Sequence, residues 1–308
     1  MLQVRVRHSP PPRRSRLLFR EAMEGRVFAL PFVLGFLFWW AYPMAYSIYL
    51  IFQDWDLLGE PQFVGLKNIA RLLSDPKVAR SLYNTAFYTF LGVPVHLLIA
   101  LLLALALNVP LRGIAVYRTV FYLPSVTPAV ASAVVWLQIF HPEFGLLNAF
   151  LGLFGIPPVK WLFEPAVAKP AFIFMTTWTI GPQIVVFLAG LQSIPESLHE
   201  AAQIDGANRW QRFVRITLPM LSPIIFFNLV IGIIGSFQVF TSAFIMTGGG
   251  PQDATLFTVL YLYRNGFEYF RMGYASTIAW LLFWIIVFFT IIQFVLARRW
   301  VYYEGRER

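Results

Sequence analysis

Six stretches of this sequence carry no Asp, Glu, Lys or Arg, and each is longer than the roughly 20 residues that a helix needs to cross a bilayer. Most of their residues are Leu, Ile, Val, Phe, Ala and Trp. Inside a bilayer no water can satisfy backbone N–H and C=O groups, so such stretches cross as helices. They lie between Arg26 and Asp54, Arg80 and Arg112, Arg118 and Glu143, Lys169 and Glu196, Arg215 and Asp253, and Arg271 and Arg298.

We therefore predict an all-α polytopic membrane protein with six transmembrane helices. Only 13% of the residues are charged, against about 25% in soluble domains. One membrane domain, residues 27–300, follows a basic tail (1–26) and precedes a short tail (301–308). A shorter uncharged window, Phe144–Val159, contains Gly-Ile-Pro-Pro and is expected to be a loop. The spans are predicted at 27–52, 84–108, 119–140, 171–192, 216–245 and 275–297, with proline kinks in or near several of them.

The distribution of Lys and Arg predicts the orientation of the chain. Six spans place both termini on one side of the membrane. The segments on that side contain 16 Lys and Arg residues, and the segments on the other side contain 8. Because cytoplasmic segments carry the excess of positive charge, we predict that both termini are cytoplasmic. The formal net charge of +9 then reflects topology, and no nucleic-acid partner is expected.

Several kinds of chemistry find no support in the sequence. The chain has no cysteine, so it forms neither disulfides nor thiolate metal sites. A P-loop needs Gly-Lys followed by Ser or Thr, and none of the four lysines follows a glycine. No paired carboxylates or metal-binding histidine motif indicates an enzyme. His96 is the only histidine in a predicted span, and we interpret it as a packed residue. We expect no catalytic residue, no metal site and no cofactor in this chain.

Uncharged polar residues in two spans are candidates for a ligand pathway. In the fifth span, Asn228, Gly232, Ser236 and Phe240 recur every four residues and so share one helical face. Amides, hydroxyls and aromatic rings suit a neutral polyhydroxylated ligand. Small and polar residues also hold membrane helices together, so packing remains the alternative. The fourth span adds three candidates, for which packing is favoured more strongly: Trp178, Thr179 and Gln183.

Two loops opposite the predicted cytoplasmic side are long. The first, 61–80, is expected to form a turn and an amphipathic helix with Ile69, Leu72 and Leu73 on one face. The second, 247–274, begins with Thr-Gly-Gly-Gly-Pro and is expected to open with a flexible turn. Both could contact a molecule that arrives from outside, and ordinary loop packing is the alternative.

A polar and basic segment, 193–215, separates the fourth and fifth predicted spans on the cytoplasmic side. Ser193 and Glu196 resemble a capping box, which predicts a helix over 196–204. Asp205-Gly206 should end it, because glycine adopts the left-handed conformation. A second short helix is expected over 207–215, before Pro219 starts the next span. Either a soluble partner or the lipid headgroups could cover this segment.

The same segment resembles a known family signature. Glu200-Ala201-Ala202 is followed, after three intervening residues, by Gly206, and then by Ile216-x-Leu218-Pro219. This pattern resembles the EAA motif of permease subunits in binding-protein-dependent ABC importers. In that family the loop is the coupling helix, which docks on the ATPase subunit. The coupling residues implied by the resemblance are Glu200, Ala201, Ala202, Asp205, Gly206, Ala207 and Phe213.

Other motifs extend the resemblance over almost the whole chain beyond its first 25 or so residues. Tyr42-Pro43, the run from Phe63 to Asn68, Leu123-Pro124 and the run from Thr247 to Pro251 resemble the carbohydrate-uptake branch, of maltose and glycerol-phosphate permease type. The chain lacks the extra N-terminal helices and large outer loop of the enterobacterial maltose permease. The resemblance implies a bacterial cytoplasmic (inner) membrane and the type I importer fold.

The resemblance also implies partners and a mechanism. The partners are a homologous second permease, two ABC ATPase subunits that bind ATP and Mg, and an extracytoplasmic solute-binding protein, with lipid around the spans. The cargo is expected to be a neutral oligosaccharide or related polyol. An anionic ligand such as glycerol phosphate is the alternative, against which the absence of Arg and Lys within the spans argues. An ATP-independent carrier and a membrane-embedded enzyme are more distant alternatives.

Overall fold

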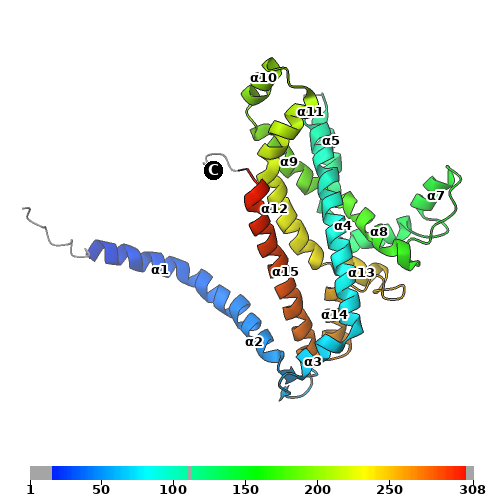
Figure 1. The fold of residues 1–308 in the computed structure, drawn as a ribbon. Coiled ribbons are helices and arrows are strands. Elements are labelled where there is room, and N and C mark those ends of the chain that lie inside the picture. Colours follow the sequence, from blue (N-terminus) through cyan, green and yellow to red (C-terminus); the bar gives the residue numbers. More distant parts are fainter. Residues whose placement is uncertain (1–15, 110–111, 303–308) are drawn as a thin grey trace, which may run out of the picture.

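The computed structural model describes residues 16–109 and 112–302, which are mostly helical (Figure 1). Within these residues the sheet is a single antiparallel pair of short strands, in which Gln53 pairs with Phe63. The elements follow in this order: α1 (Arg16–Phe36), η1 (Leu37–Ala41), α2 (Tyr42–Leu50), β1 (Gln53–Asp54), β2 (Gln62–Phe63), α3 (Lys67–Ser74), α4 (Pro76–Leu107), α5 (Ile114–Tyr122), η2 (Leu123–Val126), α6 (Ala129–Ile139), α7 (Leu146–Gly152), α8 (Pro165–Thr176), η3 (Thr177–Thr179), α9 (Gly181–Ser193), α10 (Glu196–Ile204), α11 (Arg209–Arg212), η4 (Phe213–Thr217), α12 (Leu218–Phe237), α13 (Thr241–Met246), α14 (Thr258–Tyr263), η5 (Arg264–Glu268) and α15 (Met272–Trp300).

Four helical stretches are long and apolar enough to cross a membrane without a sharp bend. The other two predicted spans are bent pairs, so the number of spans reaches six when each pair counts as one. In the third span, α5 with η2 meets α6 at 102°, and in the fourth, α8 with η3 meets α9 at 54°. Proline explains both breaks, because it lacks an N–H donor and restricts the residue before it. Pro128 directly precedes α6, and Pro182 lies in the first turn of α9.

Wide turns accommodate a proline within two of the long helices. Tyr42 donates its backbone N–H to Leu37, and Leu218 donates to Phe213, five residues back in each case. Both donors precede a proline, which cannot make the usual bond. Such π-helical turns keep the helix continuous. The fifth span therefore extends over Arg209–Met246 rather than 216–245. The first helix starts at Arg16 rather than at 27.

Helices α4, α9 and α12 pack together at the centre of the molecule. Ala100 and Ala104 of α4 are completely buried there. A Cβ atom at Gly190 of α9 would lie 2.1 Å from Ile224 Cδ1 of α12, so the missing side chain allows the two helices to approach. A second buried cluster, which includes Phe172, Phe257 and Tyr274, joins α8, α14 and α15.

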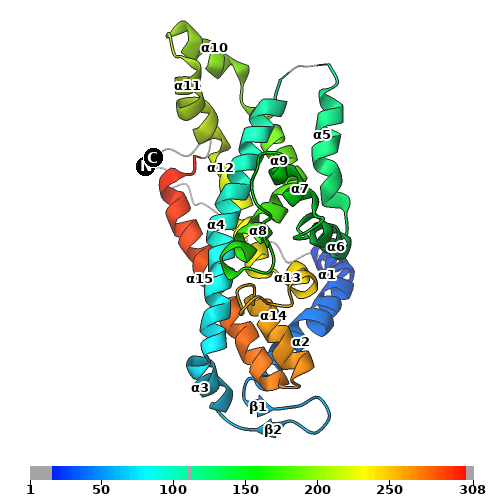
Figure 2. The ribbon, with the colours of Figure 1, turned by 90° about the vertical axis from the view of Figure 1, so that its right-hand side faces the viewer.

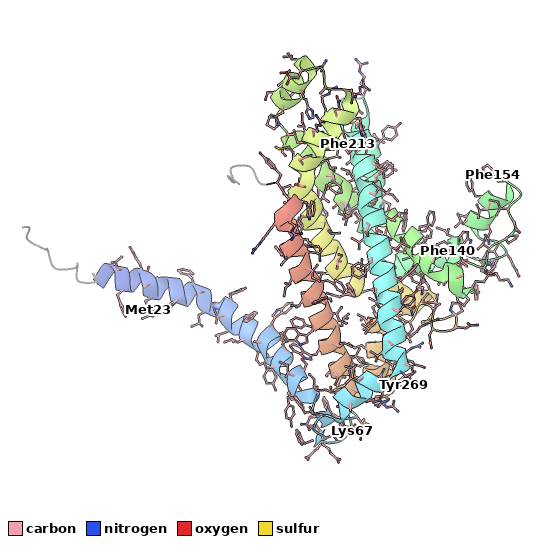
Figure 3. The ribbon with its side chains drawn as sticks, viewed as in Figure 1. Met23, Lys67, Phe140, Phe154, Phe213 and Tyr269 are labelled. Atoms are coloured by element: carbon pink, nitrogen blue, oxygen red, sulfur yellow. The ribbon has the colours of Figure 1, made fainter. Side chains whose placement is uncertain are left out.

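Helix α1 projects away from the other helices (Figure 1). None of its described side chains is buried, and Phe28 is 85% exposed. Figure 3 shows Met23 on this isolated segment. Because α1 packs against no other element of the helix bundle among the described residues, its apolar surface must be covered by lipid or by another membrane subunit.

The uncharged window Phe144–Val159 was expected to be a loop, but it contains α7. This short helix lies on an arm that projects from the bundle, with Phe154 near its end (Figure 3). Asn148 fixes the arm: its Nδ2 donates to the carbonyl oxygens of Pro142 and Val159 (both 2.9 Å), and its Oδ1 accepts from the Trp161 indole N–H (2.9 Å). The prediction failed because a buried side-chain network, rather than helical periodicity, stabilises the segment.

The predicted helix in the first long loop is present as α3, but its buried face differs. Leu72 packs on the core, whereas Leu73 is 84% exposed. The buried amide of Asn68 donates to the carbonyl oxygens of Ile51 (2.9 Å) and Gln53 (2.8 Å). These two bonds set the rotation of α3 and turn Leu73 outward. Figure 2 shows α3 with β1 and β2 at one end of the molecule, and α10 with α11 at the other.

Candidate functional site

A cleft of about 330 Å³ lies between α4, the α8–α9 bend and α12, and we call it the central cleft. It contains no Asp, Glu, Lys or Arg. Its polar groups are hydroxyls, amides and one imidazole. The lining residues are Tyr88, Gly92, Val93, His96, Leu97, Thr176, Thr179, Gln183, Asn228, Ile231, Gly232, Gly235, Ser236 and Val239.

Five of the seven predicted pathway residues line this cleft together. Asn228, Gly232 and Ser236 come from α12, Thr179 comes from the bend, and Gln183 comes from α9. The sequence pattern thus identified residues that the fold brings together. Contact of these residues with a ligand remains a prediction.

Packing also uses part of this set. A Cβ atom at Gly232 would lie 2.9 Å from Val93 Cγ1, so this glycine allows α12 to approach α4. Asn228 donates from Nδ2 to the carbonyl oxygen of Ile224 at 2.9 Å, which engages its amide within its own helix. The sequence suggested two roles for this face of α12, ligand contact and helix packing. In the structure the same face lines the central cleft and packs against α4.

The two predicted aromatic residues lie outside the lining of the cleft. Trp178 packs edge-on against Trp136, with ring centroids 5.9 Å apart. Phe240 stacks on Phe244 at 5.3 Å and contacts Tyr263 at 5.1 Å. Phe240 leaves the face of Asn228 because α12 ends at Phe237, so the spacing of four residues no longer applies.

Sequence reasoning missed the contribution of α4. Tyr88, Gly92 and His96 recur every four residues, as the residues of the α12 face do, and this spacing could have identified them. His96 had been interpreted as a packed residue. Its imidazole lies close to the Gln183 side chain and the Thr176 backbone. Among the described residues, however, neither His96 Nε2 nor Gln183 Oε1 has a partner with full hydrogen-bond geometry.

These two unpartnered atoms give the cleft unused hydrogen-bonding capacity. The hydroxyl of Thr179 donates to the carbonyl oxygen of Thr176 at 3.2 Å, which leaves its lone pairs free to accept. Buried polar atoms without partners cost free energy unless a ligand or water satisfies them. The cleft therefore suits a neutral molecule with several hydroxyl groups.

The second candidate region is the segment 193–215, which lies at one end of the long helices. We call it the coupling segment, after the role that the resemblance implies. Its first helix is α10, as predicted, and Gly206 ends it with φ +79°. Ala207 donates its N–H to the carbonyl oxygen of Ala202 at 2.9 Å, and Gly206 donates to that of Gln203 at 3.0 Å. This pair of bonds is a Schellman motif, in which the left-handed residue favours glycine.

Two other expectations about the coupling segment were wrong. Ser193 donates to the carbonyl oxygen of Gly190 and does not cap α10. The capping box lies instead between Asn208 and Gln211, at the start of α11. Because this box leads directly into the wide turn before Pro219, the second helix is the first part of the fifth span rather than a separate helix.

Much of the coupling segment is exposed. Glu200, Ala201, Asp205 and Gly206 are exposed, whereas Ala202, Ala207 and Phe213 are partly buried. Ile204 is 88% exposed and Trp210 is 70% exposed. Figure 3 places Phe213 toward the end of the molecule opposite Lys67. This end therefore exposes apolar as well as charged side chains.

The comparisons with known proteins agree with this architecture. A profile of the family described as "Binding-protein-dependent transport system inner membrane component" matches residues 69–302. The chain belongs to this family. It is therefore a multi-pass permease rather than an ATPase, and the matched region includes both the central cleft and the coupling segment.

Related permeases cover nearly the whole chain. The probable ABC transporter permease protein YesP of Bacillus subtilis (strain 168) is 43% identical over 96% of this chain and 97% of its own. The trehalose/maltose transport system permease protein MalF of Thermococcus litoralis is 34% identical over 92% and 97%. The sn-glycerol-3-phosphate transport system permease protein UgpA of Pectobacterium atrosepticum is also 34% identical, over 94% and 99%.

A solved structure shares the fold. It is a chain of a bacterial alginate ABC transporter in complex with an alginate pentasaccharide-bound periplasmic protein. The likeness has a TM-score of 0.81 and 25% sequence identity, and it covers 93% of this permease and 98% of that chain. The type I importer fold expected from the resemblance is thus confirmed.

Proposed function

We propose that this chain is a transmembrane subunit of an ATP-driven importer for a neutral oligosaccharide or related polyol. The observation that carries the proposal is the central cleft, which is polar but contains no Asp, Glu, Lys or Arg. Hydroxyl groups of a sugar would satisfy His96 and Gln183, whose buried polar atoms lack partners in the described chain. The trehalose/maltose relative supports the same class of cargo.

ATP hydrolysis would occur on partner subunits. Two ATPase subunits would bind ATP with Mg and close, moving the coupling segment through Glu200 and Gly206. The spans of this permease and of a homologous second permease would then open outward. An extracytoplasmic binding protein would release its sugar into the central cleft. This assembly would lie in the bacterial cytoplasmic membrane, with both termini in the cytoplasm.

An anionic cargo such as glycerol phosphate is a second candidate, because the glycerol-phosphate permease is as similar as the trehalose/maltose one. Phosphate groups usually bind Arg or Lys. The lining of the central cleft offers neither. The second permease would have to provide them, so we favour the neutral cargo.

The composition of the complex tests the proposal first. The tagged chain would be co-expressed with its genomic neighbours and extracted in mild detergent. The mass and the subunit composition of the intact complex would then be measured. We expect one second permease and two ATPase subunits. A chain that purifies alone and still moves solute would contradict the proposal.

Cargo class requires a separate measurement. In vesicles containing the complex, ATP-dependent uptake of a labelled oligosaccharide should be reduced by unlabelled neutral sugars and unaffected by glycerol phosphate. The reverse pattern would favour the anionic cargo. Uptake that survives ATP depletion but collapses with the ion gradient would indicate a carrier.

A further inference from the structure

A second cleft, of about 470 Å³, lies at the end of the molecule opposite the coupling segment. Five residues line it: Lys77, Tyr261, Asn265, Tyr269 and Arg271. They come from the start of α4, from α14 with η5, and from the turn before α15. We call it the basic cleft. Figure 3 places Tyr269 near this end, which is opposite the end where Phe213 lies.

The basic cleft carries two cations without an anionic partner. Lys77 and Arg271 are both exposed, and neither forms an ion pair within residues 16–109 and 112–302. The guanidinium of Arg271 lies 6.0 Å from the ring centroid of Tyr269, which leaves its N–H groups free for an outside partner. Two such cations on one cleft attract an anion, and a carboxylate matches the fork of a guanidinium.

The acidic residues nearby are already engaged. Asp75 accepts hydrogen bonds from the hydroxyls of Tyr261 and Tyr274, each at 2.6 Å, and from the backbone N–H of Lys77 at 2.9 Å. Glu268 lies 3.5 Å from Arg264, measured from Oε2 to Nε. Neither carboxylate forms an ion pair with Lys77 or Arg271 within the described residues.

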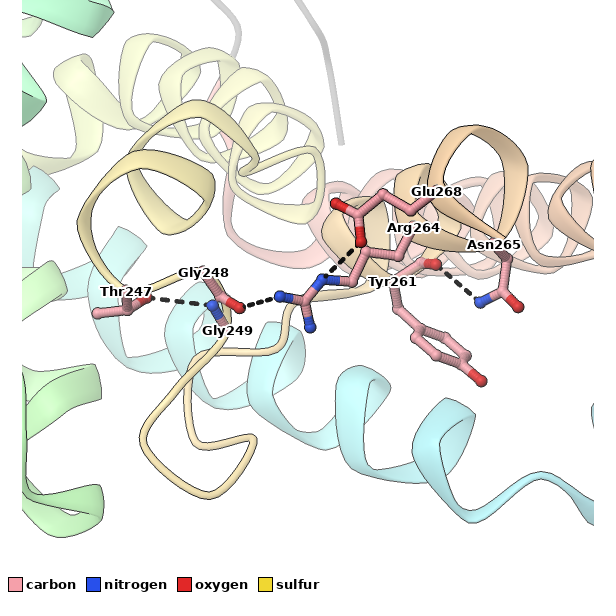
Figure 4. Close-up of polar contacts among 7 residues, drawn as sticks. All are labelled: Thr247, Gly248, Gly249, Tyr261, Arg264, Asn265 and Glu268. Carbon is pink, nitrogen blue, oxygen red and sulfur yellow. Dashed lines mark hydrogen bonds and ion pairs between the residues drawn. The ribbon is translucent and has the colours of Figure 1, made fainter. Parts of the chain in front are cut away.

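The wall of the basic cleft is held in place by buried bonds. Asn265 is 1% exposed, and its Nδ2 donates to the carbonyl oxygen of Tyr261 at 2.9 Å. Arg264 donates to the carbonyl oxygen of Gly248 and pairs with Glu268, so it links the 247–250 turn to η5 (Figure 4). The backbone N–H of Arg271 donates to the carbonyl oxygen of Asn265 at 2.8 Å. A partner would therefore meet a fixed wall with two exposed cations at its edge.

We propose that the basic cleft receives a carboxylate side chain of the extracytoplasmic binding protein when that protein docks. This inference rests on the proposed function, which places this end of the chain outside the cell. The cations line an exposed cleft at the end of the molecule, whereas none lines the central cleft. Their placement favours a docking protein over a charged cargo. Charges at an exposed interface mainly raise the rate of association and make it dependent on salt.

The test measures ATPase stimulation of the complete complex in lipid vesicles. The probe is the purified binding protein that stimulates the wild-type complex, titrated in low and in high salt. The double variant Lys77→Gln/Arg271→Gln should raise its half-saturating concentration about threefold to tenfold at low salt, because exposed ion pairs contribute modestly. High salt should shrink that difference. Basal ATPase activity and the plateau should not change.

Matched variants make the result specific. Lys160→Gln removes an exposed cation from the α7 arm and should leave the titration unchanged. Arg271→Glu should weaken docking more than Arg271→Gln, because it adds repulsion. The rise in half-saturating concentration caused by the double variant should be the same in neutral and in anionic lipid. A rise seen only in anionic lipid would mean that the basic cleft binds lipid headgroups, and it would overturn the inference.

Two further outcomes separate this inference from the proposed function. An unchanged half-saturating concentration in the double variant, with normal stimulation of the wild type, would overturn the docking inference alone. A lowered plateau with unchanged half-saturation would also overturn it, because the residues would then act in the transport step. If no binding protein stimulates the wild-type complex, both proposals fail.

Discussion

Gly206 shows how one residue can decide the shape of a functional segment. Its φ of +79° ends α10, yet a Cβ atom there would meet no atom within 4 Å. A substitution at Gly206 therefore strains the backbone without creating a clash. A non-glycine residue in this conformation costs about 1–2 kcal/mol, and a β-branched residue costs more.

We expect Gly206→Val to reduce sugar uptake severalfold more than it reduces ATP hydrolysis, because the turn that we propose transmits force would be distorted. The measurement is the ratio of sugar taken up to ATP hydrolysed in vesicles. Gly206→Asn is the matched control, because asparagine tolerates the left-handed conformation. A Gly206→Val complex with wild-type coupling would contradict a role for this turn.

Asp75 is a residue whose charge connects three elements. Partial burial pushes the pKa of Asp75 upward, but hydrogen bonds from Tyr261, Tyr274 and the Lys77 backbone, with the charge of Arg71, outweigh it and hold the pKa below its ordinary value. Burial of the Tyr261 hydroxyl and its hydrogen bond to Asp75 raise the pKa of Tyr261 to about 12. The ionised carboxylate thus ties the start of α4 to α14 and α15.

A carboxyl with a lowered pKa in the folded state stabilises the protein at pH values above its ordinary pKa, and this contribution is lost as pH falls through the lowered pKa. We therefore expect Asp75→Asn to destabilise the chain by about 1–3 kcal/mol at neutral pH and by less in acid. Thermal unfolding in detergent at several pH values measures the difference. Glu60→Gln, at an exposed acidic residue near the same end of the molecule, should show no such trend.

At the scale of elements, the two bent spans pack against each other at their bends. A Cβ atom at Gly181, the first residue of α9, would lie 2.6 Å from Tyr122 Cα and 2.7 Å from the carbonyl oxygen of Phe121. Backbone atoms cannot move aside as the end of a side chain can. The absence of a side chain at Gly181 therefore permits the 54° bend to sit beside the 102° bend.

Gly181→Ala should force α5 and α9 apart and destabilise the permease by about 1–3 kcal/mol, as overpacking typically does. Because Thr179 and Gln183 flank Gly181 and line the central cleft, sugar uptake should fall as well. The midpoint of thermal unfolding and the rate of uptake measure the two effects. Gly152→Ala, on α7 with open space around it, should change neither.

At the scale of the whole molecule, the proposed orientation places α10 in the cytoplasm and the β1–β2 loop outside. The natural chain has no cysteine, so a single introduced thiol reports its own position. Ile204 and Leu58 are 88% and 86% exposed at opposite ends.

We expect a membrane-impermeant maleimide to label Leu58→Cys in intact cells and Ile204→Cys only after permeabilisation. Labelling of both thiols after permeabilisation provides the control for reactivity. Labelling of Ile204→Cys from outside would reverse the topology and would contradict the proposed placement of both clefts.

Features that depend on local chemistry could be predicted from the sequence. Uncharged stretches longer than a bilayer predicted the six spans, and Asp205-Gly206 predicted the end of α10, because desolvation and backbone sterics act within a few residues. The spacing of Asn228, Gly232 and Ser236 likewise predicted a shared face.

Which helix faces meet each other became clear from the three-dimensional arrangement of the helices. It joined that face of α12 with Tyr88 and His96 of α4, placed Trp178 and Phe240 outside the central cleft, and formed α7 around the buried amide of Asn148. It also gathered Lys77 and Arg271, which lie far apart in the sequence, at one cleft. These arrangements depend on helix rotation and on bends between spans, which packing between distant segments sets and local sequence does not encode.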